Sequence, residues 1–228
     1  RARYSYQRNF VMRYYVIAGE ASGDLHGSNL INELKKQDAA AEIRCWGGDK
    51  MKAVGGDVVK HINELAFMGF FEVVKHLPTI LGNISFCKKD ILEFKPDVVI
   101  LIDYPGFNFR LFKFLKQHRF KIFYYISPQL WAWKKGRVKQ VRKYVDRMFV
   151  IFPFEKDFYA KHGVEVDFVG HPLLDELRIT NYELQIKQPK TIALIPGSRK
   201  QEIAYLLPEY LKVIDDFPGY KFVVTGMR

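Results

Sequence analysis

The stretch that decides the fold is DVVILID, residues 97–103, in which five apolar residues stand between two acids. A strand that is buried on both faces has a continuous apolar run, whereas a half-exposed strand alternates. We therefore predict a central strand of a parallel sheet here. Short apolar stretches and amphipathic helical stretches alternate on both sides of it, which is typical of βαβ units and of an α/β, doubly wound, mostly parallel sheet.

The alternation gives the other expected elements. Further strands are predicted at residues 13–18, 42–46, 57–61, 121–126, 147–150, 165–169, 191–195 and 221–225. Helices are predicted at residues 24–37, 70–94 with an interruption at Pro78, 107–118, 137–144, 154–161 and near 201–210.

The domain organisation follows from where this pattern starts, stops and restarts. Residues 1–11 precede the first strand and are interpreted as an upstream extension or a cloning remnant. Residues 12–178 are predicted to be a Rossmann-like domain. Residues 179–228 are predicted to be a polar linker and the start of a second Rossmann-like domain, because one strand–helix–strand unit cannot bury a core of its own.

Composition excludes several classes of protein. With 48% hydrophobic and 27% charged residues among 228, the chain is not a disordered one. Its apolar runs reach about five residues, against roughly 20 for a membrane-spanning helix. Cys45 and Cys87 are too few for a disulfide scaffold or a cysteine zinc site and indicate reduced thiols in a cytosolic protein. No HxxxH or HExxH spacing occurs, so we expect no metal site.

The loop after the first strand, residues 19–24 (GEASGD), is the first candidate site, because ligands of doubly wound sheets bind beyond the carboxyl ends of the strands. Its glycines allow a ligand to approach the backbone, and the following helix offers free N–H groups. The alternative is a tight turn with Ser22 or Asp24 as the N-cap. Glu20 lies just past the strand, where no cap is needed, and this favours substrate binding.

Asp103 ends the central strand and is the second candidate. A carboxylate at this edge can act as a general base for a hydroxyl group. It can equally cap a helix or bind a ribose. No acidic partner is evident in the sequence, so the site does not resemble that of a two-acid hydrolase.

Two more loops follow strands. In SPQLWAW, residues 127–133, the tryptophans either pack under the loop or form an apolar wall for a ligand. In PGSR, residues 196–199, the arginine suits a diphosphate, and the alternative is a surface turn.

Charge and apolar patterning mark two surfaces. The chain carries a net charge of +11, and residues 134–147 hold seven basic residues against one acid. They form a solvated helix face or meet an anionic membrane, a phosphorylated substrate or nucleic acid, although no RNA-binding or zinc-finger signature supports the last. The apolar face between residues 67 and 84 is either core or a surface for a membrane or acyl chains.

Several of these segments together resemble the lipid-A-disaccharide synthase family of bacterial glycosyltransferases. The matching segments, in order, are AGEASGD (18–24), WGG (46–48), MGFFEV (68–73), IDYPGFN (102–108), SPQLWAW (127–133), FPFE (152–155), GHPLLD (170–175) and LIPGSRKQEI (194–203). Each motif is weak by itself, but eight in order are specific.

The resemblance implies a GT-B enzyme with two Rossmann-like domains facing a cleft. Such an enzyme joins UDP-2,3-diacylglucosamine to 2,3-diacylglucosamine 1-phosphate (lipid X), giving the lipid A disaccharide 1-phosphate and UDP. It works on the cytoplasmic face of the inner membrane, on an anionic surface, with no cofactor, metal or nucleic acid, and the resemblance leaves a homodimer of the full-length protein open. Because most of a second domain is missing after Arg228, we expect the 228-residue chain alone to be inactive.

The resemblance also assigns residues, and two other functions stay open beside it. Asp103 matches the general base. Substrate binding is implied for Glu20, Ser22, Gly23, Asp24, Asn108, Gln129 and Trp131; UDP diphosphate binding for Gly197, Ser198 and Arg199; and membrane or acyl-chain contact for Met68, Phe70, Phe71, Val73, Val74 and Leu77. The alternatives are another UDP-sugar GT-B enzyme, such as the lipid II glycosyltransferase or a UDP-GlcNAc epimerase, and a non-catalytic lipid-binding protein.

Overall fold

The computed structural model describes residues 11–65, 77–177, 190–197 and 200–225. The chain divides into two compact units, Arg1–Arg178 and Ile179–Arg228, which are described separately.

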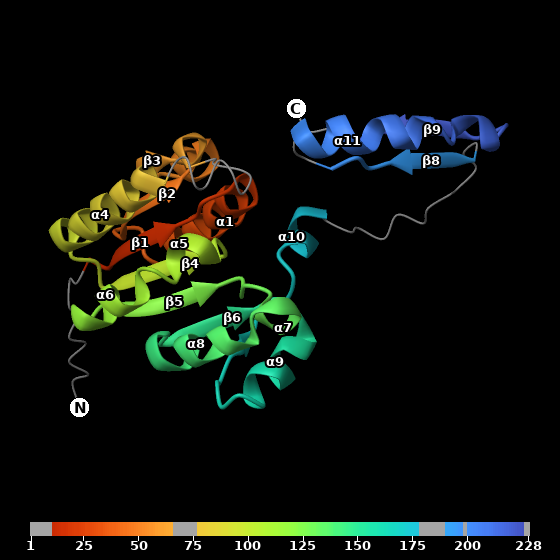
Figure 1. Ribbon diagram of the computed structural model, residues 1–228. Helices are drawn as coiled ribbons and strands as arrows, with labels where there is room; N and C mark the ends of the chain where they lie inside the picture. Colours follow the sequence, from red (N-terminus) through yellow and green to blue (C-terminus); the bar gives the residue numbers. More distant parts are fainter. Residues whose placement is uncertain (1–10, 66–76, 178–189, 198–199, 226–228) are drawn as a thin grey trace, which may run out of the picture. The chain divides into compact units, whose positions relative to one another are not determined.

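The first unit is built on one seven-stranded sheet in which every paired strand is parallel (Figure 1). The strand order is β3-β2-β1-β4-β5-β6-β7. The prediction of a central strand is confirmed, because β4 is buried along its whole length between β1 and β5. The strands are β1 (Arg13–Ile17), β2 (Glu42–Gly47), β3 (Asp57–His61), β4 (Val98–Ile102), β5 (Lys121–Tyr125), β6 (Arg147–Val150) and β7 (Asp167–Phe168).

Helices connect these strands, and several of them differ from the prediction. The helix expected at 107–118 is two short helices, and α2, α7 and α10 form in stretches where no helix was predicted. The helices are α1 (Ala21–Gln37), α2 (Asp49–Ala53), α4 (Leu77–Phe94), α5 (Pro105–Asn108), α6 (Phe112–Gln117), α7 (Leu130–Trp133), α8 (Val138–Tyr144), α9 (Pro153–Ala160) and α10 (Leu173–Leu177), with 3-10 turns at Ile62–Glu64 and Lys135–Arg137.

The start of α1 also differs, and this changes the first candidate loop. Glu20 has extended backbone angles (φ −141°, ψ 165°) and is the N-cap, so the helix begins at Ala21 rather than at Asp24. Most of the predicted loop is therefore the first turn of α1, whose free N–H groups face the carboxyl edge of the sheet.

Alternating side chains of each strand supply two separate cores, one on each face of the sheet. On one face, Tyr15, Leu101 and Tyr124 pack with residues of α4, α5, α6, α8 and α9. On the other face, Val16 and Ile100 pack with residues of α1 and α2. The helices on the first face thus contact side chains from most strands of the sheet, whereas α1 packs against β2 and β4 and α2 packs against β2 and β3.

A hydrogen-bonded chain of polar groups is built into the first core. The Tyr15 hydroxyl donates to Asp90 Oδ2 at 2.6 Å and accepts from Trp46 Nε1 at 2.9 Å. The other carboxylate oxygen of Asp90 lies 3.2 Å from the Arg44 guanidinium. Buried polar groups are tolerated when they are paired in this way, so the hydroxyl of Tyr15 satisfies two buried partners at once.

The described residues of the second unit form a strand–helix–strand element. Its strands, β8 (Thr191–Leu194) and β9 (Lys221–Val224), pair in parallel, and α11 (Lys200–Leu211) connects them with a 3-10 turn at Ile214–Asp216. Across the described parts of both units, no helix is long and apolar enough to cross a membrane.

Tyr15→Phe is expected to lower the free energy of unfolding of the first unit by about 2 kcal/mol, because it leaves both Asp90 and Trp46 without their buried partner. Urea unfolding followed by tryptophan fluorescence measures this, since all three tryptophans lie in the first unit. The control is Tyr14→Phe on the opposite face of β1, whose hydroxyl donates to no described residue. Equal stability of the two variants would contradict the role given to the Tyr15 hydroxyl.

Candidate functional site

The strand order creates a crevice at the carboxyl ends of β1 and β4. From β1 the chain proceeds outward through β2 and β3, and it then returns to place β4 on the other side of β1. Such a switch point is where doubly wound sheets bind their ligands. Glu20 follows β1 and Asp103 follows β4, so two acids 83 positions apart in sequence meet at this edge.

The negative charge of Glu20 acts electrostatically on Asp103. The pKa of Asp103 is raised to about 6, first by loss of surrounding water and second by the negative charge of Glu20, while a hydrogen bond from the Tyr104 backbone lowers it. Both side chains remain reachable from solvent. No acidic partner of Asp103 was evident in the sequence. The structure brings Glu20, which follows β1, to the same edge of the sheet, and sequence spacing does not reveal this neighbour.

The backbone at Asp103 takes an unusual turn. Asp103 and Tyr104 both adopt left-handed angles (φ 42° and 47°), which cost a non-glycine residue roughly 1–2 kcal/mol. The Asp103 amide donates to the Tyr125 carbonyl at 3.2 Å. The Asp103 carbonyl accepts hydrogen bonds from the Tyr124 hydroxyl and from Asn108 Nδ2, the latter at 2.7 Å. Asp103 stands in this turn at the sheet edge with its side chain exposed.

Gly19 makes room for the turn. A Cβ at Gly19 would lie 2.4 Å from two ring carbons of Tyr104, so a larger residue would displace the ring. The Tyr104 ring also stacks on Phe107, with centroids 5.4 Å apart. The last residue before Glu20 is therefore a glycine because the neighbouring loop packs directly on its backbone.

The rest of the first motif divides between exposed and anchoring residues. Ser22 is exposed in the first turn of α1, whereas Gly23 is buried. A Cβ at Gly23 would lie 3.1 Å from the Ala18 Cβ, which is a tight contact. Asp24 is also buried, and its carboxylate accepts from the amides of Gly48 (2.6 Å), Met51 (3.1 Å) and Lys50 (3.1 Å). Asp24, predicted to bind substrate, thus holds the start of α2 in this structure.

Asn108 also has a different position from the one expected of a substrate ligand. Its side chain is fully buried, and its amide nitrogen donates a hydrogen bond to the Asp103 carbonyl. Asn108 therefore stabilises the Asp103 loop from inside the protein and is not exposed to the crevice.

Residues of α9 contact and stabilise the loop after β5. The Ser127 hydroxyl lies 2.7 Å from that of Tyr159, whose pKa burial raises to about 12. Trp131 packs edge-on against Phe154 at 5.0 Å, which supports the packing alternative for this residue. Its indole N–H is buried and has no partner among the described residues. Gln129, which lies between Ser127 and Trp131 in sequence, is exposed.

The basic segment, residues 134–147, forms a solvent-facing surface on α8 and the turn before it. Most of its cations are exposed, but Arg137 is half-buried over the Phe109 ring at 5.1 Å, and Arg147 pairs with Asp167 at 2.8 Å. The one acid, Asp146, pairs with Lys116 at 2.8 Å. The positive charge is therefore only partly neutralised within the protein.

Several predicted site residues lie outside the described residues. These are Met68, Phe70, Phe71, Val73 and Val74 of the apolar segment and Ser198 and Arg199 of the second unit. Leu77 is the first residue of α4. Gly197 has φ 103° and would place a Cβ 2.6 Å from the Glu202 carboxylate, so glycine is needed at this turn.

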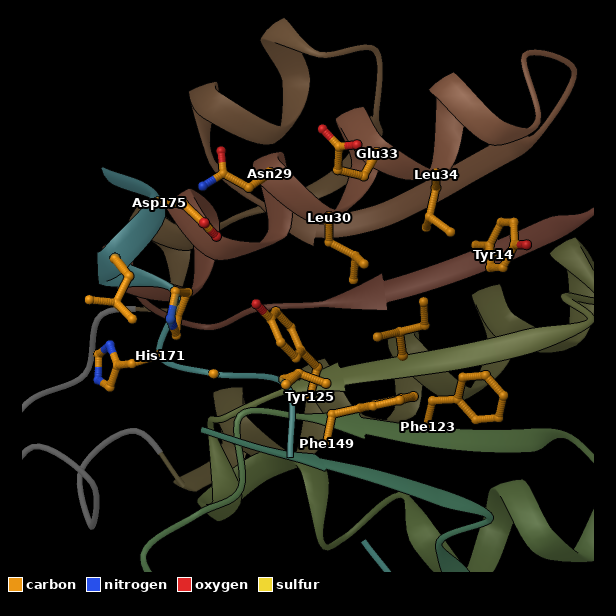
Figure 2. Close-up of a pocket in the computed structure, with 15 residues that line it drawn as sticks. Tyr14, Asn29, Leu30, Glu33, Leu34, Phe123, Tyr125, Phe149, His171 and Asp175 are labelled. Atoms are coloured by element: carbon orange, nitrogen blue, oxygen red, sulfur yellow. The ribbon is translucent and has the colours of Figure 1, made fainter. Parts of the chain in front are cut away.

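An apolar groove of about 540 Å³ lies on the other face of the sheet, beside α1 (Figure 2). Figure 2 shows Leu30 and Leu34 above Tyr125 and Phe149 on the strands, with Asp175 at one end. Sequence reasoning missed it, because half-covered strands in a parallel sheet have the same apolar pattern as fully covered ones. Its apolar walls suit an apolar occupant rather than a sugar diphosphate, and neither Glu20 nor Asp103 lines it.

No cluster of three side chains that could hold a metal ion occurs within the described ranges. What the crevice offers is a carboxylate able to accept a proton near neutral pH, a second carboxylate and the N-terminus of α1.

Comparison with known proteins gives a consistent family. The Lipid-A-disaccharide synthetase family matches residues 14–224. The lipid-A-disaccharide synthase of Geobacter metallireducens is 42% identical over 93% of this chain, and that of Syntrophus aciditrophicus is 44% identical over 86%. The chain spans 58% and 53% of these two relatives.

Solved structures show the same fold at low identity. The UDP-GlcNAc 2-epimerase of Neisseria meningitidis bound to UDP-GlcNAc matches with a TM-score of 0.64 at 15% identity, over 95% of this chain and 66% of that one. The calicheamicin glycosyltransferase CalG4 matches with a TM-score of 0.55 at 13% identity, over 94% and 64%. The predicted α/β, GT-B-type fold is thereby confirmed.

Glu20→Gln is expected to lower the pKa of Asp103 from about 6 toward its ordinary value, without reaching it, because the like charge is removed while the loss of water remains. Carbon-13 NMR of the Asp103 carboxyl, titrated in the 228-residue chain, measures this. The control is Glu93→Gln, an exposed acid near the end of α4. An Asp103 pKa that stays at its wild-type value in Glu20→Gln would show that the two acids do not interact.

Proposed function

Because the chain belongs to the lipid-A-disaccharide synthetase family, we propose that the whole protein transfers 2,3-diacylglucosamine from UDP-2,3-diacylglucosamine to the 6-hydroxyl of 2,3-diacylglucosamine 1-phosphate. The products are the lipid A disaccharide 1-phosphate and UDP. The observation that carries the proposal beyond family membership is Asp103, placed at the switch point of the sheet with a pKa of about 6.

In this reaction Asp103 is the general base. A donor with an α-linked UDP and a β-linked product require inversion, so the acceptor oxygen attacks C1 from the side opposite to the leaving group. Asp103 takes the hydroxyl proton, the oxygen forms the new bond to C1, and the bond from C1 to the diphosphate oxygen breaks with its electrons. At neutral pH a carboxyl group with a pKa of about 6 is mostly ionised, yet basic enough to accept a proton in the transition state.

The second unit is proposed to bind the leaving group. Gly197, Ser198 and Arg199 follow β8, and an arginine at a strand-to-helix turn suits a diphosphate through paired hydrogen bonds. Its positive charge would stabilise the negative charge that develops on UDP as the bond to C1 breaks.

Both substrates carry acyl chains, so the enzyme is proposed to work at the surface of the inner membrane, on its cytoplasmic side. Residues 68–77 are the proposed apolar contact. The basic segment is the proposed contact with anionic headgroups, where each lysine or arginine near the surface contributes about 1 kcal/mol. Its exposed cations on α8 support this proposal.

Asp103→Asn in the whole protein is expected to lower kcat by about 10²–10⁴-fold, because the amide cannot accept the hydroxyl proton. Mass spectrometry of the products from UDP-2,3-diacylglucosamine and lipid X measures it. In the wild type, kcat is expected to rise with pH through about 6 and then level, since a carboxyl group with a raised pKa acts as a base only when ionised. Release of UDP without the lipid acceptor, or no disaccharide from the wild type, would contradict the proposed function.

Lys135→Glu combined with Arg142→Glu is expected to weaken binding of the 228-residue chain to vesicles with about 30% anionic lipid by at least about tenfold. Vesicle co-sedimentation at low and high salt measures this. The matched control, Lys52→Glu with Lys89→Glu, makes the same change in net charge at exposed positions outside the basic segment. If both double variants lose equal affinity, net charge rather than the basic segment attracts the membrane.

A further inference from the structure

We propose, on the premise that Asp103 is the base of the proposed transfer, that Tyr124 and Asn108 are positioning residues that fix the direction of the Asp103 carboxylate by holding its backbone carbonyl. Neither residue would touch substrate.

Two side chains from different elements converge on one backbone oxygen. The Tyr124 hydroxyl comes from β5, the strand next to β4, and Asn108 Nδ2 comes from α5, directly after the Asp103 loop. Both side chains are fully buried. A carbonyl oxygen has two lone pairs, so the pair of donors uses its whole capacity.

The Asp103 loop needs such support. Left-handed angles at Asp103 and Tyr104 are disfavoured and persist only where the surroundings hold them. The Asp103 amide is fixed by the Tyr125 carbonyl on the strand side, and the Asp103 carbonyl is fixed by Tyr124 and Asn108 on the other. Because both its amide and its carbonyl are held, the backbone of Asp103 fixes the direction of the Cα–Cβ bond. This directs the carboxylate to a position where the charge of Glu20 acts on it.

The hydroxyl of Tyr124 can be separated from the packing of its ring. The ring meets Phe109 and Phe112 edge-on, with centroids 6.2 and 6.1 Å away. These contacts remain in Tyr124→Phe, so that variant keeps the ring packing and removes the hydrogen bonds of the hydroxyl, to the Asp103 carbonyl and with Asn108. Burial, and next the charge of Asp103, hold the pKa of Tyr124 well above its ordinary value, so the hydroxyl stays a donor at every pH at which the protein works.

The first test is a titration of the Asp103 carboxyl by carbon-13 NMR in the 228-residue chain. In Tyr124→Phe the freed loop lets the carboxylate turn into water and away from Glu20, so the pKa of Asp103 is expected to fall from about 6 toward its ordinary 3.8. Tyr15→Phe is the matched control, because it also removes a buried, hydrogen-bonded hydroxyl from the same core. It is expected to lose stability and to leave the pKa of Asp103 unchanged.

The second test uses the whole protein. Tyr124→Phe is expected to lower kcat by about tenfold or more, to leave KM for both substrates within about twofold, and to move the acid limb of the kcat profile below pH 6. Tyr15→Phe is expected to keep the wild-type limb. Asn108→Ala should repeat the Tyr124→Phe result. If the alanine variant does not fold, Asn108→Leu replaces it, because leucine also lacks the donor but keeps most of the side-chain volume.

An unchanged Asp103 pKa in Tyr124→Phe overturns the proposal, as does the same pKa shift in Tyr15→Phe. The NMR titration does not depend on catalysis. If the wild-type protein makes no disaccharide, the proposed function fails, while the titration still decides whether Tyr124 positions Asp103.

Discussion

The candidate site depends on one constraint, the left-handed turn at Asp103 and Tyr104 where β4 ends. The turn is disfavoured by itself, and it is held by hydrogen bonds from β5 and α5 and by the contact of Tyr104 with Gly19. Asn108 follows the turn directly, whereas Tyr124 and Gly19 come from segments that are distant from it in sequence. The site therefore forms only when β1, β4 and β5 are paired in register, which links its geometry to the completed sheet.

The same pairing explains the electrical character of the site. Because β1 lies next to β4, Glu20 and Asp103 are brought to one edge, and the negative charge of Glu20 disfavours ionisation of Asp103. Two like charges at a crevice cost stability, and proteins keep such arrangements where chemistry uses them. A general base must be ionised at neutral pH and must still accept a proton readily. A moderately raised pKa such as that of Asp103 meets both needs, whereas a pKa well above 7 would leave the group protonated.

The sequence allowed the sheet to be predicted but only part of the site. Strands such as residues 57–61 and 147–150 agree with the structure at both ends, because apolar runs bounded by polar residues mark strands directly. The pairing of Glu20 with Asp103 depended on strand order, which no local pattern states. The roles of Asp24 and Asn108 depended on which oxygens and amides their side chains reach, and residue type alone cannot distinguish a buried anchor from a ligand.

The motif after β1 therefore contains residues with two different duties. Glu20 faces the crevice and changes the pKa of Asp103, whereas Asp24, four positions later, points into the fold and holds the start of α2. Both carboxylates would lower activity if removed, one by changing the site and the other by loosening the protein around it. A loss of activity alone thus cannot identify a substrate ligand in this motif. Measuring stability together with activity separates the two. Only the Asp24 carboxylate accepts hydrogen bonds from the free backbone N–H groups at the start of α2, so only its removal is expected to destabilise the protein.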